Sequence, residues 1–110
     1  MAKDLNITIL LDVYGQLLTE KQRDAVDMYY NEDLSLAEIA DEIDISRQGV
    51  LASIKQGERH LAEFEDALGI AKRFRVISEK LGKIGSIVDT SDLKEKEEIK
   101  KLLQEIQSEI

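Results

Sequence analysis

Residues 35–60, SLAEIADEIDISRQGVLASIKQGERH, constrain the fold of this chain more than any other stretch. They open with Ser35 three residues before Glu38, a pattern typical of a capping box at the start of a helix. Asp44 interrupts the helical spacing, and Ser46 can cap a second helix soon after it. The apolar residues of both helices fall in one register: Leu36, Ile39, Ala40, Ile43, Ile45, Val50 and Ile54. The stretch therefore predicts two helices joined by a tight turn, which is a helix-turn-helix.

The rest of the chain favours an all-α fold around this motif. It has 110 residues, enough for one domain or for a small domain with a helical appendage. It contains no proline, 43% of its residues are hydrophobic, and helix-period patterns dominate. Cysteine is absent, which excludes disulfide bonds and thiolate metal sites. We therefore predict an all-α protein of five or six helices.

Two helices are expected before the motif, and its second helix is expected to extend beyond it. Residues 5–18 carry one apolar stripe, and TEKQ at residues 19–22 forms a second capping box that opens another helix. The second helix of the motif continues to Gly69 over roughly 23 residues, and its far half is expected to dock the C-terminal region. The stripe of the first helix comprises Leu10, Val13, Tyr14, Leu17 and Leu18.

The last part of the chain has the pattern of a helical hairpin. Apolar residues at alternating spacings of four and three fill residues 70–88, a seam typical of paired helices. A polar break at residues 89–92 follows, and the last helix is expected to begin within it. We predict a helix-turn-helix domain with its N-terminal helix over residues 1–69 and a C-terminal helical hairpin over residues 70–110. Packing of the hairpin within the chain and pairing with a second copy, as a homodimer, are both open.

Charge is distributed unevenly along the chain. The formal net charge is −8, which argues against simple nucleic-acid binding. Only residues 46–60 and 70–83 carry a net positive charge, so these segments could contact a nucleic acid while the remaining surface repels it. The second segment places five basic side chains opposite its apolar seam: Lys72, Arg73, Arg75, Lys80 and Lys83. An acidic protein is equally suited to a basic protein partner.

The sequence offers no catalytic constellation. His60 is the only histidine, without a cysteine or second histidine to share an ion, so we expect no metal and no cofactor. Phosphate-binding glycine loops and nucleophile motifs are absent, so we expect neither an enzyme nor a small-molecule substrate. Tyr29 and Tyr30 could stack on bases, although packing is the commoner role for such residues. The sequence lacks a membrane-spanning stretch and a secretion signal, so we expect a cytoplasmic protein without membrane insertion.

Two family resemblances add to this pattern. Residues 18–61, which include LTEKQRDAVDMYYNEDLSLAEIADEIDISRQGV, look like region 4 of bacterial sigma-70 factors, whose helix-turn-helix reads promoter DNA. The runs LLDVYGQLLTEKQR, DLSLAEIA and ISRQGV, with LG at residues 68–69, resemble the YlxM family of small bacterial helix-turn-helix proteins. The resemblance implies a three-helix core of the homeodomain or winged-helix kind. It also implies a regulatory or accessory role in the signal recognition particle pathway of co-translational protein targeting.

The sigma resemblance assigns the DNA-facing residues to the second helix of the motif. Arg47 could bind a guanine and Gln48 an adenine, each worth roughly 1–3 kcal/mol of discrimination. Ser46 lies beside them at the start of the same helix. Lys55 and Arg59 could bind phosphates further along it.

Three hypotheses about function follow. In the first, the protein is a DNA-binding regulator that uses the second helix of the motif. In the second, it is an accessory factor of the signal recognition particle with no DNA binding. It would then contact a protein through its acidic surface, through Leu51 or through the basic face at residues 72–83. The basic face could instead contact the particle's RNA. In the third, the motif is only a helical scaffold and the hairpin forms an oligomer. Leu51 is expected on an outward face, which suits a protein contact better than a DNA groove.

Overall fold

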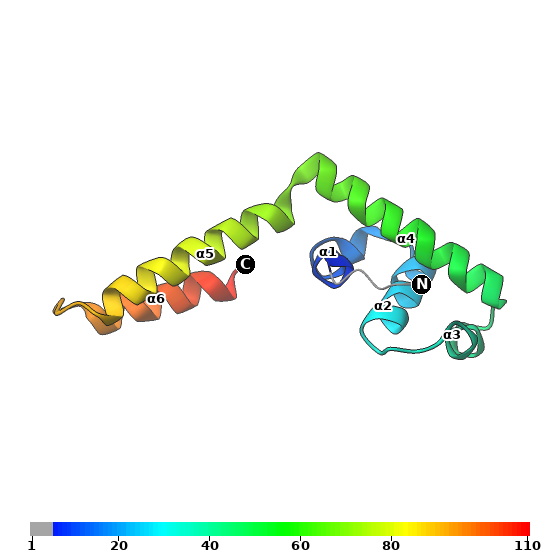
Figure 1. Ribbon diagram of the computed structural model, residues 1–110, viewed down its shortest axis with the longest axis horizontal. Coiled ribbons are helices and arrows are strands. Elements are labelled where there is room, and N and C mark those ends of the chain that lie inside the picture. Colours follow the sequence, from blue (N-terminus) through cyan, green and yellow to red (C-terminus); the bar gives the residue numbers. More distant parts are fainter. Residues whose placement is uncertain (1–5) are drawn as a thin grey trace. The chain divides into compact units, whose positions relative to one another are not determined.

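The computed structural model describes residues 6–110, which form six α-helices, one 3₁₀ turn and no strand (Figure 1). The all-α prediction is therefore confirmed for the described part of the chain. The elements are α1 (Asn6–Tyr14), the 3₁₀ turn η1 (Gly15–Leu17), α2 (Glu20–Tyr30), α3 (Leu36–Ile43), α4 (Arg47–Leu68), α5 (Ile70–Asp89) and α6 (Lys96–Ser108). They divide into a first unit that ends at Ala71 and a second unit, Lys72–Ile110. The predicted domain over residues 1–69 includes five residues that lie outside the described ones.

Both predicted capping boxes are present. The backbone N–H of Gln22 donates to Thr19 Oγ1 at 3.2 Å, and the N–H of Thr19 donates to Gln22 Oε1 at 3.4 Å. Ser35 and Glu38 exchange the same two bonds, each at 3.1 Å. These side chains satisfy N–H groups that have no partner in the first turn of a helix. Local sequence therefore sets the starts of α2 and α3.

The N-terminal helix is shorter than expected, and its buried face differs from the predicted stripe. Helix α1 ends at Tyr14, and η1 then turns with about three residues per turn instead of 3.6. This change rotates the following residues, so that Leu17 is 59% exposed although the stripe predicted it inside. Ile7 and Leu11 are buried in its place, beside Tyr14 and Leu18.

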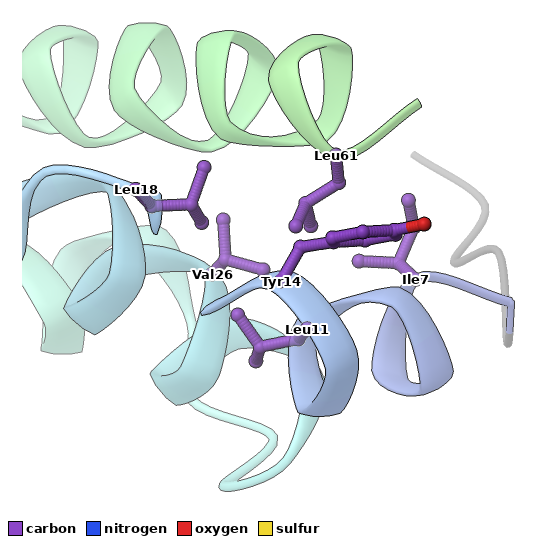
Figure 2. Packing of buried hydrophobic residues seen from close by; sticks show 6 residues of the cluster. All are labelled: Ile7, Leu11, Tyr14, Leu18, Val26 and Leu61. Atoms are coloured by element: carbon purple, nitrogen blue, oxygen red, sulfur yellow. The ribbon is translucent and has the colours of Figure 1, made fainter. Parts of the chain in front are cut away.

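Two clusters of buried side chains form the core of the first unit. The cluster between α1, α2 and α4 contains Ile7, Leu11, Tyr14, Leu18, Val26 and Leu61 (Figure 2). The cluster between α2, α3 and α4 contains Ala25, Ile39, Ala40, Val50 and Ile54. Helix α4 contributes to both clusters and so holds the other three helices together. In the far half of α4, Leu61 packs with side chains of α1 and α2, and Ile70 at the start of α5 packs against the same cluster.

A close crossing of α2 and α4 depends on Gly57. A Cβ atom at this position would lie 2.7 Å from Cγ2 of Val26, closer than real Cβ atoms approach another heavy atom. Gly57 is buried, and Gln22 also lies beside it. The sequence analysis missed this residue, because a glycine within an amphipathic helix gives no local sign of what crosses it.

Hydrogen bonds at the end of α4 fix the start of α5. Gly69 adopts a left-handed conformation with φ 63°, as expected for a glycine after a helix. The Tyr14 hydroxyl donates to Glu65 Oε1 at 2.6 Å and accepts from the N–H of Ile70 at 3.1 Å. The same Glu65 oxygen accepts from the N–H of Ala71 at 3.0 Å. Burial, followed by the bond to Glu65, raises the pKa of the Tyr14 hydroxyl above its usual value.

The second unit consists of α5 and α6, which run antiparallel to each other (Figure 1). Lys100 Nζ lies 2.9 Å from Asp89 Oδ1, and Lys96 Nζ donates to the Asp89 carbonyl at 2.7 Å. Helix α6 begins at Lys96, after the polar break rather than within it. The Ser91 hydroxyl explains the delay, because it donates to the Val88 carbonyl at 2.7 Å and closes the end of α5 instead of capping α6. No helix within residues 6–110 is long and apolar enough to span a membrane.

Candidate nucleic-acid interface

The turn between α3 and α4 has the tight geometry that the sequence predicted. Asp44 lies in the left-handed region with φ 56° and ψ 48°, and its N–H donates to the Ala40 carbonyl. The N–H of Ile45 donates to the same carbonyl at 3.2 Å. An aspartate tolerates this conformation better than most residues, although less cheaply than glycine.

Ser46 caps α4 and is supported by the glycine that follows. The N–H of Gly49 donates to Ser46 Oγ at 3.0 Å. A Cβ at residue 49 would lie 3.2 Å from that oxygen and 3.4 Å from Cδ1 of Ile45. Gly49 therefore leaves room for both the cap and the corner side chain. The predicted DNA-facing hydroxyl of Ser46 thus has a structural role at the first turn.

Three of the predicted contact residues lie along one exposed line of α4. Val50, Ile54 and Leu61 are fully buried, which fixes the inner face of this helix. At 3.6 residues per turn the opposite line carries the α4 stripe, which consists of Gln48, Ala52, Lys55 and Arg59. All four residues are exposed.

Arg47 and Leu51 lie to one side of the α4 stripe. Arg47 is exposed at the first residue of α4, and Leu51 follows four residues later on the same side. Leu51 is half-buried, so it faces outward less than the sequence pattern suggested. The structure therefore brings Ser46, Arg47 and Gln48 together at the start of α4 and leaves Leu51 at the edge.

The positive charge of the stripe extends no further than Arg59. Arg59 Nε lies 3.9 Å from Glu63 Oε1, and the two side chains are 63% and 65% exposed. An exposed pair of this kind contributes little to stability and leaves the arginine able to exchange partners. Asp66 lies near the same line about two turns further, so the positive charge of this line ends at Arg59.

Helix α3 presents negative charge close to the start of α4. Glu38, Asp41 and Glu42 are exposed on α3, and Asp44 is exposed at the turn. Charges within about 8–10 Å of a phosphate act on it at physiological salt. These carboxylates repel a phosphate that approaches the start of α4.

The aromatic residues and the histidine mostly serve packing. The rings of Tyr29 and Tyr30 meet edge to face with centroids 5.2 Å apart, and both are half-buried against the α2–α3–α4 cluster. The Tyr30 hydroxyl donates to Glu58 Oε1 at 2.7 Å. His60 packs against Phe64 with ring centroids 6.4 Å apart. Residues 6–110 hold no group of three or more histidine or acidic side chains suited to a metal ion.

The left-handed turn, the capped start of α4 and the shared core of α2, α3 and α4 define an all-helical helix-turn-helix protein. The chain belongs to the UPF0122 family, because the model of that family, described as "Putative helix-turn-helix protein, YlxM / p13 like", matches residues 1–107. The resemblance to YlxM proteins is therefore confirmed. The match extends beyond the motif through α5 and most of α6.

Bacterial relatives agree with this assignment. The chain is 46% identical over 107 residues to a UPF0122 protein of Thermoanaerobacter sp. (strain X514), covering 96% of this chain and 92% of the relative. It is 44% identical over 90 residues to one from Clostridium kluyveri, covering 82% and 81%. It is 45% identical over 87 residues to one from Halalkalibacterium halodurans, covering 79% and 80%.

Proposed function

We propose that this protein is a cytoplasmic DNA-binding regulator that inserts the start of α4 into a major groove. The observation that carries the proposal is the exposed α4 stripe opposite a fully buried face. Helix-turn-helix proteins contact base edges with the first residues of their second helix. In that position Arg47 would bind a guanine and Gln48 an adenine.

Phosphate contacts would come from the next turns of α4. Lys55 and Arg59 follow Gln48 along the stripe, and both are exposed. Contacts of this kind fix orientation and make the affinity depend on salt. The carboxylates of α3 and the net charge of −8 work against them, so we expect modest affinity that falls steeply as salt increases.

The second candidate function is an accessory role in the signal recognition particle pathway without DNA binding. It is supported by the resemblance to YlxM proteins, by the exposed carboxylates of α3 and by the half-buried Leu51 of α4. In that role, the surface of the helix-turn-helix, with its acidic side chains, would bind a basic protein. The particle's RNA would instead meet the exposed basic residues of α5: Lys72, Arg73, Arg75, Lys80 and Lys83.

Binding of the purified protein to random-sequence duplex DNA and to signal recognition particle RNA, across a salt series, separates these candidates. For DNA binding through α4 we expect Lys55→Ala to reduce the salt slope by about one. Lys21→Ala removes an equally exposed charge from α2 and serves as the matched control. Unchanged affinity of the double variant Arg47→Ala, Lys55→Ala for every duplex would refute DNA binding by α4. Binding of RNA alone would favour the accessory role.

Contact between α4 and DNA requires only one copy of the chain. The homodimer expected through the C-terminal helices is therefore independent of this proposal and depends on the surface of the hairpin itself.

A further inference from the structure

The second unit has no core of its own. Within Lys72–Ile110 only Val88 is buried. Phe74, Leu81, Ile99 and Leu103 are half-buried. Eight other large apolar side chains are between 37% and 68% exposed: Val76, Ile77, Ile84, Ile87, Leu93, Leu102, Ile106 and Ile110. An amphipathic layer is stable only when its apolar side packs on a second layer. Two helices alone do not supply that layer.

Most of the exposed apolar side chains gather on one face of the hairpin. The helices α5 and α6 run antiparallel (Figure 1). With 3.6 residues per turn, this arrangement predicts that the apolar flanks of both helices face the same side. We call this the apolar hairpin face, and it consists of Val76, Ile77, Ile84, Ile87, Leu102 and Ile106. The opposite side carries small or polar residues: Gly82, Ser86, Gln104 and Ser108. Contiguous apolar patches of this kind mark interaction sites.

The two edges of the apolar hairpin face carry opposite charge. The same helical geometry places Lys83 at the outer α5 edge and sets Arg73 and Lys80 between Ile84 and Ile87 on the α5 side of the face. Glu98, Glu105 and Glu109 lie along the α6 edge. All six residues are exposed. A basic edge and an acidic edge on one face complement a second copy of the same face.

We propose that the apolar hairpin face binds a second copy of the chain, with α5 of each copy lying across α6 of the other. A two-fold axis parallel to the helices produces this arrangement and makes the contact self-complementary. The two hairpins then form an antiparallel four-helix bundle, whose core consists of the residues exposed in one copy. A pairing of α5 with α5 would bring the two basic edges together, so charge selects the crossed arrangement.

The register of the hairpin predicts which charges meet. A Cβ at residue 85 would lie 3.9 Å from Cδ1 of Leu103, and Asp89 pairs with Lys100. Residue 85 therefore lies at the same height along the hairpin as Leu103, and Asp89 lies at the same height as Lys100. The two-fold axis keeps each residue at its own height. Lys83 of one copy therefore lies opposite the partner copy's Glu105, and Lys80 lies opposite the partner copy's Glu109.

A second copy fits this face better than a nucleic acid does. Phosphates would be attracted by Arg73, Lys80 and Lys83 but repelled by the glutamates of the neighbouring edge. They would also leave the apolar residues between the edges in water. Burial of those residues supplies the main driving force for association.

Sedimentation equilibrium of the full chain, over a range of concentrations, tests the proposal. We expect a reversible dimer of the 12.5 kDa chain. Ile84→Lys puts a charge at the centre of the face and should weaken the dimer at least about tenfold. Ser86→Lys, on the opposite side of α5, is the matched control and should leave it unchanged. Circular dichroism of both variants verifies that the helices form.

Exchanging charges tests the crossed arrangement. Lys83→Glu and Glu105→Lys should each weaken the dimer, and the double variant should restore it because the two charges are only exchanged. A wild-type chain that stays monomeric at its highest soluble concentration would overturn the proposal, whether or not its basic edge binds RNA. A dimer unaffected by Ile84→Lys would overturn the assigned face, and a double variant weaker than both single variants would overturn the crossed pairing.

Discussion

Helices α4 and α5 have similar lengths, 22 and 20 residues, but very different surroundings. Helix α4 buries residues along most of its length against α1, α2 and α3, whereas α5 buries only Val88. Both have an apolar stripe at helical spacing, and full burial of a large apolar side chain is worth about 1.5–3 kcal/mol. The difference teaches that an amphipathic pattern specifies a helix and one face, while the stability gained depends on what covers that face.

Truncation of matched isoleucines should show the largest contrast. Ile54 is fully buried, so Ile54→Ala should lower the free energy of unfolding by about 2–5 kcal/mol. Ile84 is 45% exposed, so Ile84→Ala should cost much less in a dilute, monomeric sample. Urea denaturation followed by circular dichroism gives both values. Equal losses would mean that the two regions are packed alike.

Alanine in place of two helical glycines should give effects of opposite sign. Gly57→Ala should destabilise the protein by about 1–3 kcal/mol, because its Cβ would meet Val26 at 2.7 Å. Gly82 has nothing within 4 Å of its added Cβ, so Gly82→Ala should stabilise α5 by roughly 0.5–1 kcal/mol. Thermal unfolding of the two variants measures both changes in stability. A stabilising Gly57→Ala would contradict the close crossing of α2 and α4.

Removal of the residues that precede α2 and α6 should give a smaller difference in stability between the two units. Thr19 accepts a bond from the N–H of Gln22, so Thr19→Ala should cost about 1 kcal/mol. Glu95 precedes α6 without a side-chain cap bond, so Glu95→Ala should leave stability nearly unchanged. Urea midpoints of both variants measure the difference. A loss as large at Glu95 as at Thr19 would show that α6 depends on a cap after all.

The smallest expected effect is the pH dependence of the hairpin ion pair. The bond from Lys100 holds the pKa of Asp89 below its usual 3.8, and Asp89 holds the pKa of Lys100 above its usual 10.5. The stabilisation is therefore complete between these two usual values. It is lost as pH falls through the lowered pKa of Asp89 or rises through the raised pKa of Lys100.

A comparison of Lys100→Met with the wild type across pH measures this contribution as a difference in urea midpoint. The pair is exposed, so the difference should be small at neutral pH and vanish in strong acid. A difference that persists below the titration of Asp89 would assign the effect to packing of the lysine stem instead.

Local signals predicted much of the first unit. The capping boxes at Thr19 and Ser35, the turn at Asp44 and the C-terminal glycine at residue 69 all follow from short-range hydrogen bonding and backbone sterics. The helical spacing of the apolar residues in α4 also predicted which side of this helix is exposed. The sequence analysis failed at Leu17, where a 3₁₀ turn changes the phase of the stripe.

The sequence by itself determined that the chain is helical, where most helices begin and end, and which residues of α4 face outward, because these depend on interactions within a few residues. Only the tertiary structure decided that Leu61 packs on α1 and that Gly57 allows α2 to cross closely. It also decided that Ile77 and Ile84 of the α5 seam stay exposed within the hairpin. Contacts between residues distant in the chain depend on shape and on the available partner surface, and neither is recorded in the spacing of one helix.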